Sequence, residues 1–363
     1  MSNLSSRLPE LIALASEDSS EKRRTLLREL TESFFGTDQR SETETTLYDQ
    51  ILVKLTSEME VAVRAEMSKR FSILRSAPMG LVRSLANDDE AVVADAVLRA
   101  SPLLTDEDLL GVVRTKGQQH LRAVSSREAV SEAVSDVIVE RGDDTTLGTL
   151  LRNDGAQLSR SASETAIERA KVNPALHAAA VQRKSLPPDL LNEMYFVVEA
   201  RLRQQILERN ASMDPKLVEA AVAAGRARVE TDDGSLPADY QTCLAEVTRL
   251  QSSGQLSPQV LARFVRTEGQ TSFLIALSKL SDIDFHTAEQ IVKRKELDAL
   301  AVVCRGANVD RALFLTFAVV LLNDEGDAMA KAKGYADLYN QLTPDAAQRT
   351  LRFWRMRRTA QAA

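Results

Sequence analysis

The chain has 363 residues, of which 44% are hydrophobic and only 4% are aromatic. It can therefore bury a substantial core, and its Leu, Ala and Val content favours packed helices over sheets, which prefer aromatic and β-branched residues. The net charge of -6 argues against a protein whose whole surface binds nucleic acid or an anionic membrane, since such binding needs a positive field.

The cysteines and the apolar runs indicate the compartment. Cys243 and Cys304 are the only cysteines, and both lie on apolar helical stripes, which suits buried thiols in a reducing compartment. Residues 1–10 lack the basic and apolar regions of a signal peptide. The longest apolar run, residues 312–322, is about half the roughly 20 residues of a membrane span, so we expect a buried core helix there. Together these features predict a cytoplasmic protein without a membrane span.

The N-terminal residues predict helices that open a stack. Residues 8–15 and 21–35 have apolar residues at helical spacing, and Gly36 ends the second of these helices. Residues 42–55 and 60–71 form the first full helix pair. The two helices before this pair are expected to cap the stack.

One pattern recurs from residue 78 to residue 183: a turn rich in Asn, Asp or Gly, then an apolar position, then a helix-forming run. The residues that we align at the apolar position are Val63, Val93, Leu121 and Leu158. Their separations of about 30, 28 and 37 residues are in the range of two-helix repeats. The clearest internal echo is between residues 85–88 and residues 151–154. Since a lone helix pair cannot bury its apolar stripe, the sequence predicts an all-α fold of two-helix repeats stacked as a short α-solenoid.

Helix caps divide this stack into units. The expected helices are at residues 79–85, 91–99, 105 onward and 130–140, followed by a fifth unit at residues 147–183. Thr105 can cap a helix whose acidic first turn lies at the positive end of the helix dipole, and Gly142 supplies a C-terminal stop. Helix capping therefore accounts for the acidic residues at 106–108.

The chain beyond the repeats predicts a second domain. Residues 189–210 are expected to form one long helix and residues 214–229 another, before the Gly- and Pro-containing segment 231–237. We therefore predict a helical-repeat domain at 1–230, a linker at 231–238 and a smaller non-repeat helical domain at 239–363. The helices of the smaller domain are expected at residues 240–251, 258–266, 270–280, 285–294, 296–305, 310–322, 324–342 and 344–358.

Several short sequence motifs in the middle units resemble those of a known family. They are Leu-Ala-Asn-Asp at 85–88, Ser-Pro-Leu-Leu-Thr-Asp at 101–106, Val-Arg-Thr at 113–115 and Val-Ser-Glu-Ala-Val-Ser-Asp at 130–136. The chain resembles, over residues 8–280, an uncharacterised alphaproteobacterial family defined by domain of unknown function 2336, itself similar to HEAT and leucine-rich-variant repeats. The tail at 351–355 is similar to that of rhizobial members, whereas residues 125–128 depart from the expected basic, proline-containing segment. The resemblance implies an α-helical scaffold with no established activity, cofactor or catalytic residue.

The sequence holds no recognisable catalytic, metal or nucleotide motif. His120, His177 and His286 are too separated for an evident metal cluster, and no His-Glu-x-x-His, paired Cys-x-x-Cys, glycine-rich phosphate loop or Gly-x-Ser-x-Gly elbow occurs. We therefore expect no cofactor and no enzyme activity. A phosphoryl group could be accepted by an exposed histidine, but the position of His120 at a repeat turn favours a structural role.

The C-terminal segment is basic and aromatic in an acidic chain. Residues 344–358 hold five arginines against one aspartate. Arginine stacks on aromatic rings and binds carboxylate or phosphate in a fork, so this helix could dock an acidic partner, RNA or a membrane surface. The alternative is that its apolar residues pack on the C-terminal domain. The candidate partner-binding residues are Arg349, Arg352, Trp354, Arg355, Arg357 and Arg358.

These features favour a cytoplasmic scaffold or regulatory adaptor that binds a partner protein, because curved helical stacks offer long surfaces for recognition. The alternative is a nucleic-acid-associated or phosphorelay-linked regulator that uses the basic C-terminal helix. Binding that weakens steeply with salt would distinguish nucleic acid from a protein partner.

Overall fold

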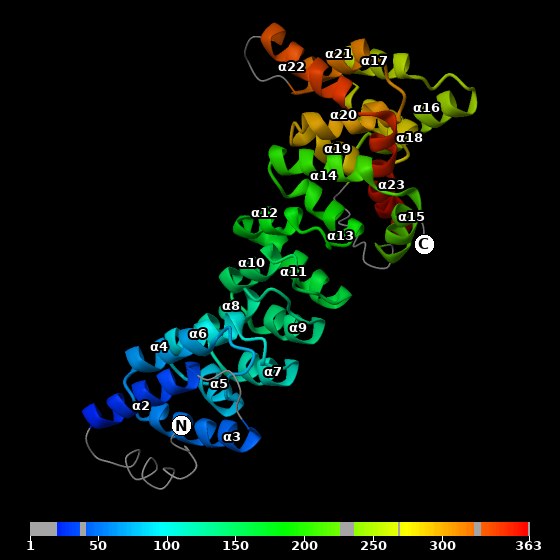
Figure 1. Ribbon diagram of the computed structural model, residues 1–363. Coiled ribbons are helices and arrows are strands. Elements are labelled where there is room, and N and C mark those ends of the chain that lie inside the picture. The colour runs from blue at the N-terminus through cyan, green and yellow to red at the C-terminus, as the bar shows by residue number, and fades with distance from the viewer. Residues whose placement is uncertain (1–19, 37–40, 226–235, 268, 323–327, 362–363) are drawn as a thin grey trace. The chain divides into compact units, whose positions relative to one another are not determined.

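The computed structural model describes residues 20–36, 41–225, 236–267, 269–322 and 328–361 (Figure 1). In these ranges the protein is all-α, as predicted, and its β-type pairing is a single isolated bridge between Val130 and Ala156. The predicted helix at 8–15 lies outside the described residues. Backbone contacts divide the chain into two units, Met1–Ser185 (unit 1) and Leu186–Ala363 (unit 2).

Unit 1 is a stack of helix pairs in two layers, preceded by α2 (Ser20–Phe35) (Figure 1). The first layer consists of α3 (Glu42–Ser57), α5 (Met79–Ala86), α7 (Asp106–Thr115), α9 (Glu132–Arg141) and α11 (Arg160–Val172). The second layer consists of α4 (Val61–Phe71), α6 (Ala91–Ala100), α8 (Gln118–Ser125), α10 (Asp144–Arg152) and α12 (Pro174–Gln182). Each first-layer helix packs on the second-layer helix that follows it, and the second-layer helices pack on one another in chain order. Each pair thereby buries its apolar stripe against its neighbours.

The N-caps of the second layer define the repeat register. They are Glu60, Glu90, Gly117, Asp143 and Asn173, at separations of 30, 27, 26 and 30 residues. Val63 and Val93 are both the third residue after the N-cap, so the predicted alignment is correct for this pair. Leu121 is the fourth residue, one position out of register. Leu158 is half-buried and precedes the first-layer helix α11, so its predicted equivalence is wrong.

Side chains at the ends of the second-layer helices bind the preceding helix of that layer. Arg127, just after α8, donates to the carbonyls of Leu98 (2.6 Å) and Ser101 (2.8 Å) at the end of α6. Asn153, just after α10, donates to the carbonyl of Ser125 (2.9 Å) at the end of α8. Carbonyls in the last turn of a helix have no partner within the helix. These side chains therefore satisfy helix ends and join consecutive repeats in one step.

The same arrangement continues at Arg183, just after α12. Its guanidinium, in a side chain that is almost completely buried, donates to four carbonyls at and beyond the end of α10, those of Leu150, Leu151, Asn153 and Ala156. The first layer has a counterpart, because Arg141 donates to the carbonyl of Val113 and Arg169 donates to that of Val139 (3.1 Å). We call the residues Arg127, Asn153 and Arg183 the carbonyl ladder.

The loops beside the carbonyl ladder approach each other closely. The amide of Val130 donates to the carbonyl of Gly155 (3.2 Å), and the amide of Gln157 donates to the carbonyl of Val130 (2.9 Å). A Cβ at Gly155 would lie 1.9 Å from the carbonyl oxygen of Glu128. Only glycine fits this approach without movement of the backbone.

Unit 2 is a helical assembly without the two-layer repeat. Its elements are α13 (Pro188–Glu193), η1 (Met194–Phe196), α14 (Ala200–Ser212), α15 (Pro215–Gly225), α16 (Tyr240–Ser252), α17 (Pro258–Arg266), α18 (Gln270–Ser281), α19 (Phe285–Lys293), α20 (Leu297–Gly306), α21 (Arg311–Leu322), α22 (Ala328–Gln341) and α23 (Pro344–Gln361). The last helix, α23, packs on α13, α14, α15 and α20. The C-terminal helix thus joins the first and middle helices of the unit.

The core of unit 2 is centred on α18 and α20, in which residues 272–278 and 298–304 are buried without interruption. The apolar run in α21 was expected to be a core helix, but only one face of it is buried. Phe314 and Phe317 are fully buried, whereas Val320 is 57% exposed. The apolar run therefore does not by itself determine burial, which depends on the face that packs on neighbouring helices.

The predicted linker at 231–238 lies within unit 2. Backbone contacts divide the two units between Ser185 and Leu186, and α14 and α15 pack on α23 within unit 2. Of the linker, residues 231–235 lie outside the described residues.

The predicted long helix at 189–210 is interrupted by η1, and α14 begins only at Ala200. The interruption falls on a run of aromatic and β-branched residues, which disfavour helix, and Tyr195 of this run is completely buried. Its packing in the core therefore competes with continuation of the helix.

Candidate functional site

The predicted docking residues lie on α23, and one of them is in the core. Trp354 is 3% exposed, and its ring lies 5.0 Å from that of Tyr195 and 5.1 Å from that of Phe196. These distances are typical of attractive aromatic pairs. Trp354 therefore contributes to the packing of unit 2 and not to an exposed surface.

Two of the arginines bind the ends of neighbouring helices. Arg349 donates to the carbonyl of Ala211 near the end of α14. Arg355 donates to the carbonyl of Ser281 at the end of α18 (3.1 Å), and burial lowers the pKa of its guanidinium. Both side chains are half-buried. Their contacts follow the principle of the carbonyl ladder and hold α23 in place.

Arg352 points outward on the same helix. It is 44% exposed and forms an ion pair with Glu219, which is 65% exposed, at 2.5 Å. The side chains of Arg357 and Arg358 lie outside the described part of the chain. Among the predicted docking residues whose side chains are described, Arg352 is the exposed one.

The histidines and cysteines singled out in the sequence are held inside their units. His120 is 4% exposed, and its Nε2 lies 2.9 Å from the carbonyl oxygen of Asp88, so it does not form the exposed acceptor that phosphotransfer needs. Burial raises the pKa of the Cys304 thiol, which disfavours the reactive thiolate. Cys243, expected to be buried, is half-buried, and its thiol lies 3.6 Å from a carboxylate oxygen of Asp239.

A buried ionic cluster joins α14 to the start of α20. The Nε of Arg203 donates to a carboxylate oxygen of Asp298 at 2.5 Å, and its Nη1 lies 3.9 Å from a carboxylate oxygen of Glu296. The three side chains are only 14%, 9% and 8% exposed. The cluster therefore sets two carboxylates against one guanidinium in a poorly solvated place.

The surroundings of the cluster shift the pKa values of its members. Burial raises the pKa of Glu296, because the loss of hydration outweighs the attraction of Arg203. Its Oε2 is buried and makes no hydrogen bond. Burial and the nearby Asp298 carboxylate also raise the pKa of the Tyr195 hydroxyl. The cluster thus contains one carboxyl group, Glu296, that is poorly stabilised in its charged form.

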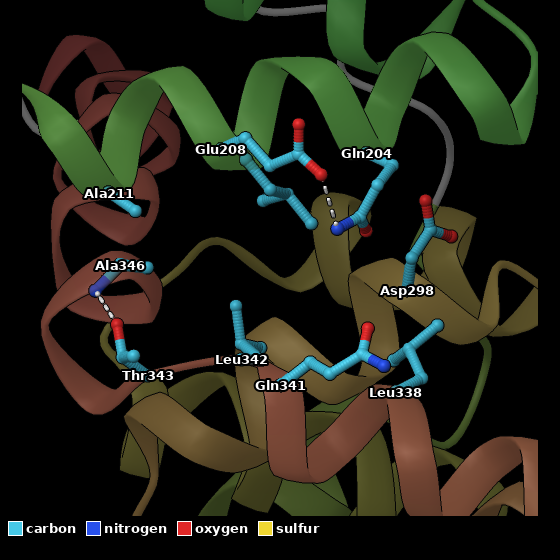
Figure 2. A pocket seen from close by; sticks show the side chains of 10 residues that line it. Gln204, Glu208, Ala211, Asp298, Leu338, Gln341, Leu342, Thr343 and Ala346 are labelled. Atoms are coloured by element: carbon cyan, nitrogen blue, oxygen red, sulfur yellow. Dashed lines mark hydrogen bonds between the residues drawn. The ribbon is translucent and has the colours of Figure 1, made fainter.

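A pocket opens beside this cluster, between α14, α20, the end of α22 and the start of α23 (Figure 2). It encloses about 440 Å³ of empty space, its open mouth included. The residues that line it are Gln204, Leu207, Glu208, Ala211, Asp298, Leu338, Gln341, Leu342, Thr343 and Ala346. Two of these side chains, Glu208 and Asp298, are acidic and none is basic, so the pocket combines apolar walls with a negative rim.

Sequence reasoning missed both the pocket and the carbonyl ladder. The pocket brings together residues more than 90 positions apart, and no local pattern marks such a group. The ladder does leave a signal, since Arg127 and Arg183 are both the tenth residue after the N-cap of a second-layer helix, two repeats apart. The true repeat register would have aligned them.

In the described part of the chain, no group of three or more His, Cys, Asp or Glu side chains is arranged to hold a metal ion. Among the described helices, none is long and apolar enough to cross a membrane.

Comparison with known proteins gives one match. Residues 93–352 match a family model whose description is an uncharacterised protein conserved in bacteria. The match begins in α6 and ends in α23, so it includes about half of unit 1 and most of unit 2. No curated protein and no solved structure matches the chain.

Proposed function

The chain belongs to the bacterial family DUF2336, and from this premise we propose that it is a HEAT-like helical-repeat scaffold or regulatory adaptor that binds a partner protein and is not an enzyme. The proposal places the protein in the cytoplasm and its binding surface on the second layer of unit 1. It rests on the exposure pattern of that layer.

The second-layer helices share a register of buried and exposed positions. In all five, the seventh and eighth residues after the N-cap are buried. The second residues are all exposed: Ala62, Val92, Gln119, Thr145 and Ala175. The ninth residues are Lys69, Arg99, Ser126, Arg152 and Gln182, and all but the half-buried Ser126 are exposed. Equivalent positions with different side chains therefore form two rows across the stack.

Such rows suit the recognition of another chain. The buried positions hold the stack together, whereas the exposed rows vary in side chain between repeats, and such variation lets helical-repeat surfaces distinguish partners. Val92 is 60% exposed and can serve as an apolar anchor, and three of the five ninth positions are basic. A partner with acidic groups near an apolar residue is the best match to this face.

Affinity capture from cells of the native organism, followed by mass spectrometry, tests the proposal. The informative variant is the double substitution Arg99→Glu and Arg152→Glu, because both residues lie in the ninth-position row. The matched control is Arg114→Glu, an exposed arginine on α7 in the first layer. We expect the double variant to lose the partner and the control to keep it, with equal helical content by circular dichroism.

A partner that is captured equally by both variants would refute the second layer as the binding surface. In that case Arg352 on α23 is the next residue to change, since it is the exposed member of the predicted docking helix. Capture that disappears after nuclease treatment and weakens steeply with salt would support the alternative, a nucleic-acid-associated regulator.

A further inference from the structure

The pocket of unit 2 has walls suited to an aliphatic chain. Leu207 on α14 and Leu338 and Leu342 near the end of α22 provide apolar surface that is free of charge. Figure 2 shows side chains from α14 on one side of the space and from α22 on the other. A narrow apolar group that enters between them is removed from water on both sides, which is favourable.

The polar side chains that line the pocket are two carboxylates, Glu208 and Asp298, the two amides Gln204 and Gln341, and the hydroxyl of Thr343. The Nε2 of Gln204 donates to Glu208 at 3.2 Å, which orients this amide so that its carbonyl oxygen remains as an acceptor. Asp298 lines the pocket from α20 and its side chain is 9% exposed (Figure 2). Asp298 is paired with Arg203 at 2.5 Å, whereas Glu208 has no ion pair with this arginine. The pocket therefore offers acceptors and negative charge without a basic side chain in its lining.

We propose that this pocket binds a primary ammonium group on an aliphatic stem, with the ammonium between Gln204, Glu208 and Asp298 and the stem between the three leucines. An ammonium is a compact cation with three donors and no acceptor, which matches a group of acceptors at the end of an apolar slot. A neutral alcohol would leave the negative rim uncompensated, and an alkyl carboxylate would be repelled by it.

This inference stands apart from the scaffold proposal, because all the residues concerned belong to unit 2. The chemistry has two sources, a free aliphatic amine or the lysine side chain of a partner protein. Both present the same group to the pocket. The experiment therefore begins with the shared chemistry and then separates the sources.

The test is a titration of the full chain with pentylamine, followed by the chemical shifts of the methyl groups of isotope-labelled leucines. We expect saturable shifts at Leu207, Leu338 and Leu342 with pentylamine, and at least tenfold weaker binding of 1-pentanol at equal concentrations. The variant Glu208→Gln should weaken pentylamine at least fivefold and leave 1-pentanol unchanged. Its control, Glu199→Gln, removes an exposed carboxylate at the N-cap of α14 and should have no effect.

A steric variant tests the location without changing charge. Ala211→Leu adds a side chain at the lining of the pocket, whereas Ala220→Leu adds the same side chain at an exposed position of α15. We expect only Ala211→Leu to abolish the pentylamine shifts. Equal binding of pentylamine and 1-pentanol, or no effect of either Glu208→Gln or Ala211→Leu, would overturn the proposal.

A second pair of ligands distinguishes a free aliphatic amine from the lysine side chain of a partner protein. A tripeptide Ala-Lys-Ala with blocked ends presents a lysine side chain, and the same peptide with norleucine in place of lysine is its neutral control. Binding of the lysine peptide at least as tight as that of pentylamine assigns the pocket to a partner's lysine. Binding of pentylamine with exclusion of the lysine peptide assigns it to a free amine.

Discussion

Arg183 allows the carbonyl ladder to be tested quantitatively. Its side chain is 2% exposed, and its guanidinium donates to the carbonyls of Asn153 (3.0 Å) and Ala156, with longer contacts to Leu150 (3.3 Å) and Leu151 (3.4 Å). Replacement by methionine keeps an apolar stem of similar length and removes every donor. We therefore expect Arg183→Met to remove the side-chain donor of the Ala156 carbonyl, whereas the carbonyl of Asn153 loses one of two donors, because it also accepts from the amide of Ala156 (3.2 Å).

The expected loss of unfolding free energy follows from the two shortest contacts of Arg183, those to the carbonyls of Asn153 and Ala156. A hydrogen bond to a charged group contributes about 1.5–3 kcal/mol, and a buried group left without a partner costs about 1–3 kcal/mol. Because these figures describe the same loss from two sides, they are not added, and two contacts give roughly 3–5 kcal/mol. Arg183→Lys should fall between wild type and methionine, since an ammonium cannot bind two carbonyls in a fork.

Urea unfolding followed by circular dichroism measures the loss, and hydrogen exchange locates it. The control is Arg152→Met, an exposed arginine at the end of α10, for which we expect a change within about 0.5 kcal/mol. Amides of α10 and α12 should exchange faster in Arg183→Met, whereas those of α3 should be unaffected. Equal effects of the two methionine variants would refute the structural role of the ladder.

Three further predictions, with five substitutions between them, test other parts of the structure. Gly155→Ala should destabilise the protein, because the new Cβ would lie 1.9 Å from a backbone carbonyl oxygen, whereas Gly111→Ala, with no atom within 4 Å, should stabilise α7 by about 0.5–1 kcal/mol; thermal melts of the same sign for both would contradict this. Leu121→Ala should lower the free energy of unfolding in urea by about 2–5 kcal/mol, and Leu158→Ala should lower it less, because only Leu121 is fully buried. Equal losses for the two variants would support the alignment of Leu121 with Leu158 predicted from the sequence. Burial raises the folded-state pKa of Glu296, so stability is lost as pH rises from about 4.3 through the raised value. Glu296→Gln should remove this loss in unfolding followed by tryptophan fluorescence, and an unchanged pH slope would show that another group is responsible.

The helical content of the protein was predictable because it depends on local properties. Apolar spacing and caps are read within a few residues, and Ser41 and Thr105 form complete capping boxes with Glu44 and Asp108. The end of a helix was predictable for the same reason, as at residue 71 and residue 266. Helix content and most helix ends follow from short segments of the chain.

The repeat register was not predictable in the same way. The echo between residues 85–88 and 151–154 compares the end of α5, in the first layer, with the end of α10, in the second. An Asn stands at the turn after each helix. The side chain of Asn87 donates to the carbonyl of Arg83 in its own helix, whereas that of Asn153 donates to the carbonyl of Ser125 in the preceding repeat. The same residue type therefore serves two layers, and the sequence alone does not separate them.

The candidate sites were even less accessible to sequence reasoning. The six docking residues were chosen for charge and aromatic character, and these properties do not distinguish a side chain that binds a partner from one that binds the end of a neighbouring helix. Arg349 and Arg355 bind helix ends, whereas Arg352, three residues from either, is exposed. Because Arg349, Arg352 and Arg355 are three residues apart, they lie near one another on α23. Which of them binds a helix end and which is exposed therefore depends on the helices packed around α23.

The carbonyl ladder also explains how the repeats tolerate unequal lengths. The N-caps of the second layer are separated by 26 to 30 residues, so loops between repeats differ, yet the seventh and eighth residues remain buried in every helix. From α6 to α12, Arg127, Asn153 and Arg183 fix the C-terminal ends of consecutive helices to one another independently of the loops. Because the ninth position lies directly before these donors, its exposed row keeps its place from repeat to repeat. A stack built in this way can vary its loops and its exposed side chains while it preserves the surface on which the proposed recognition depends.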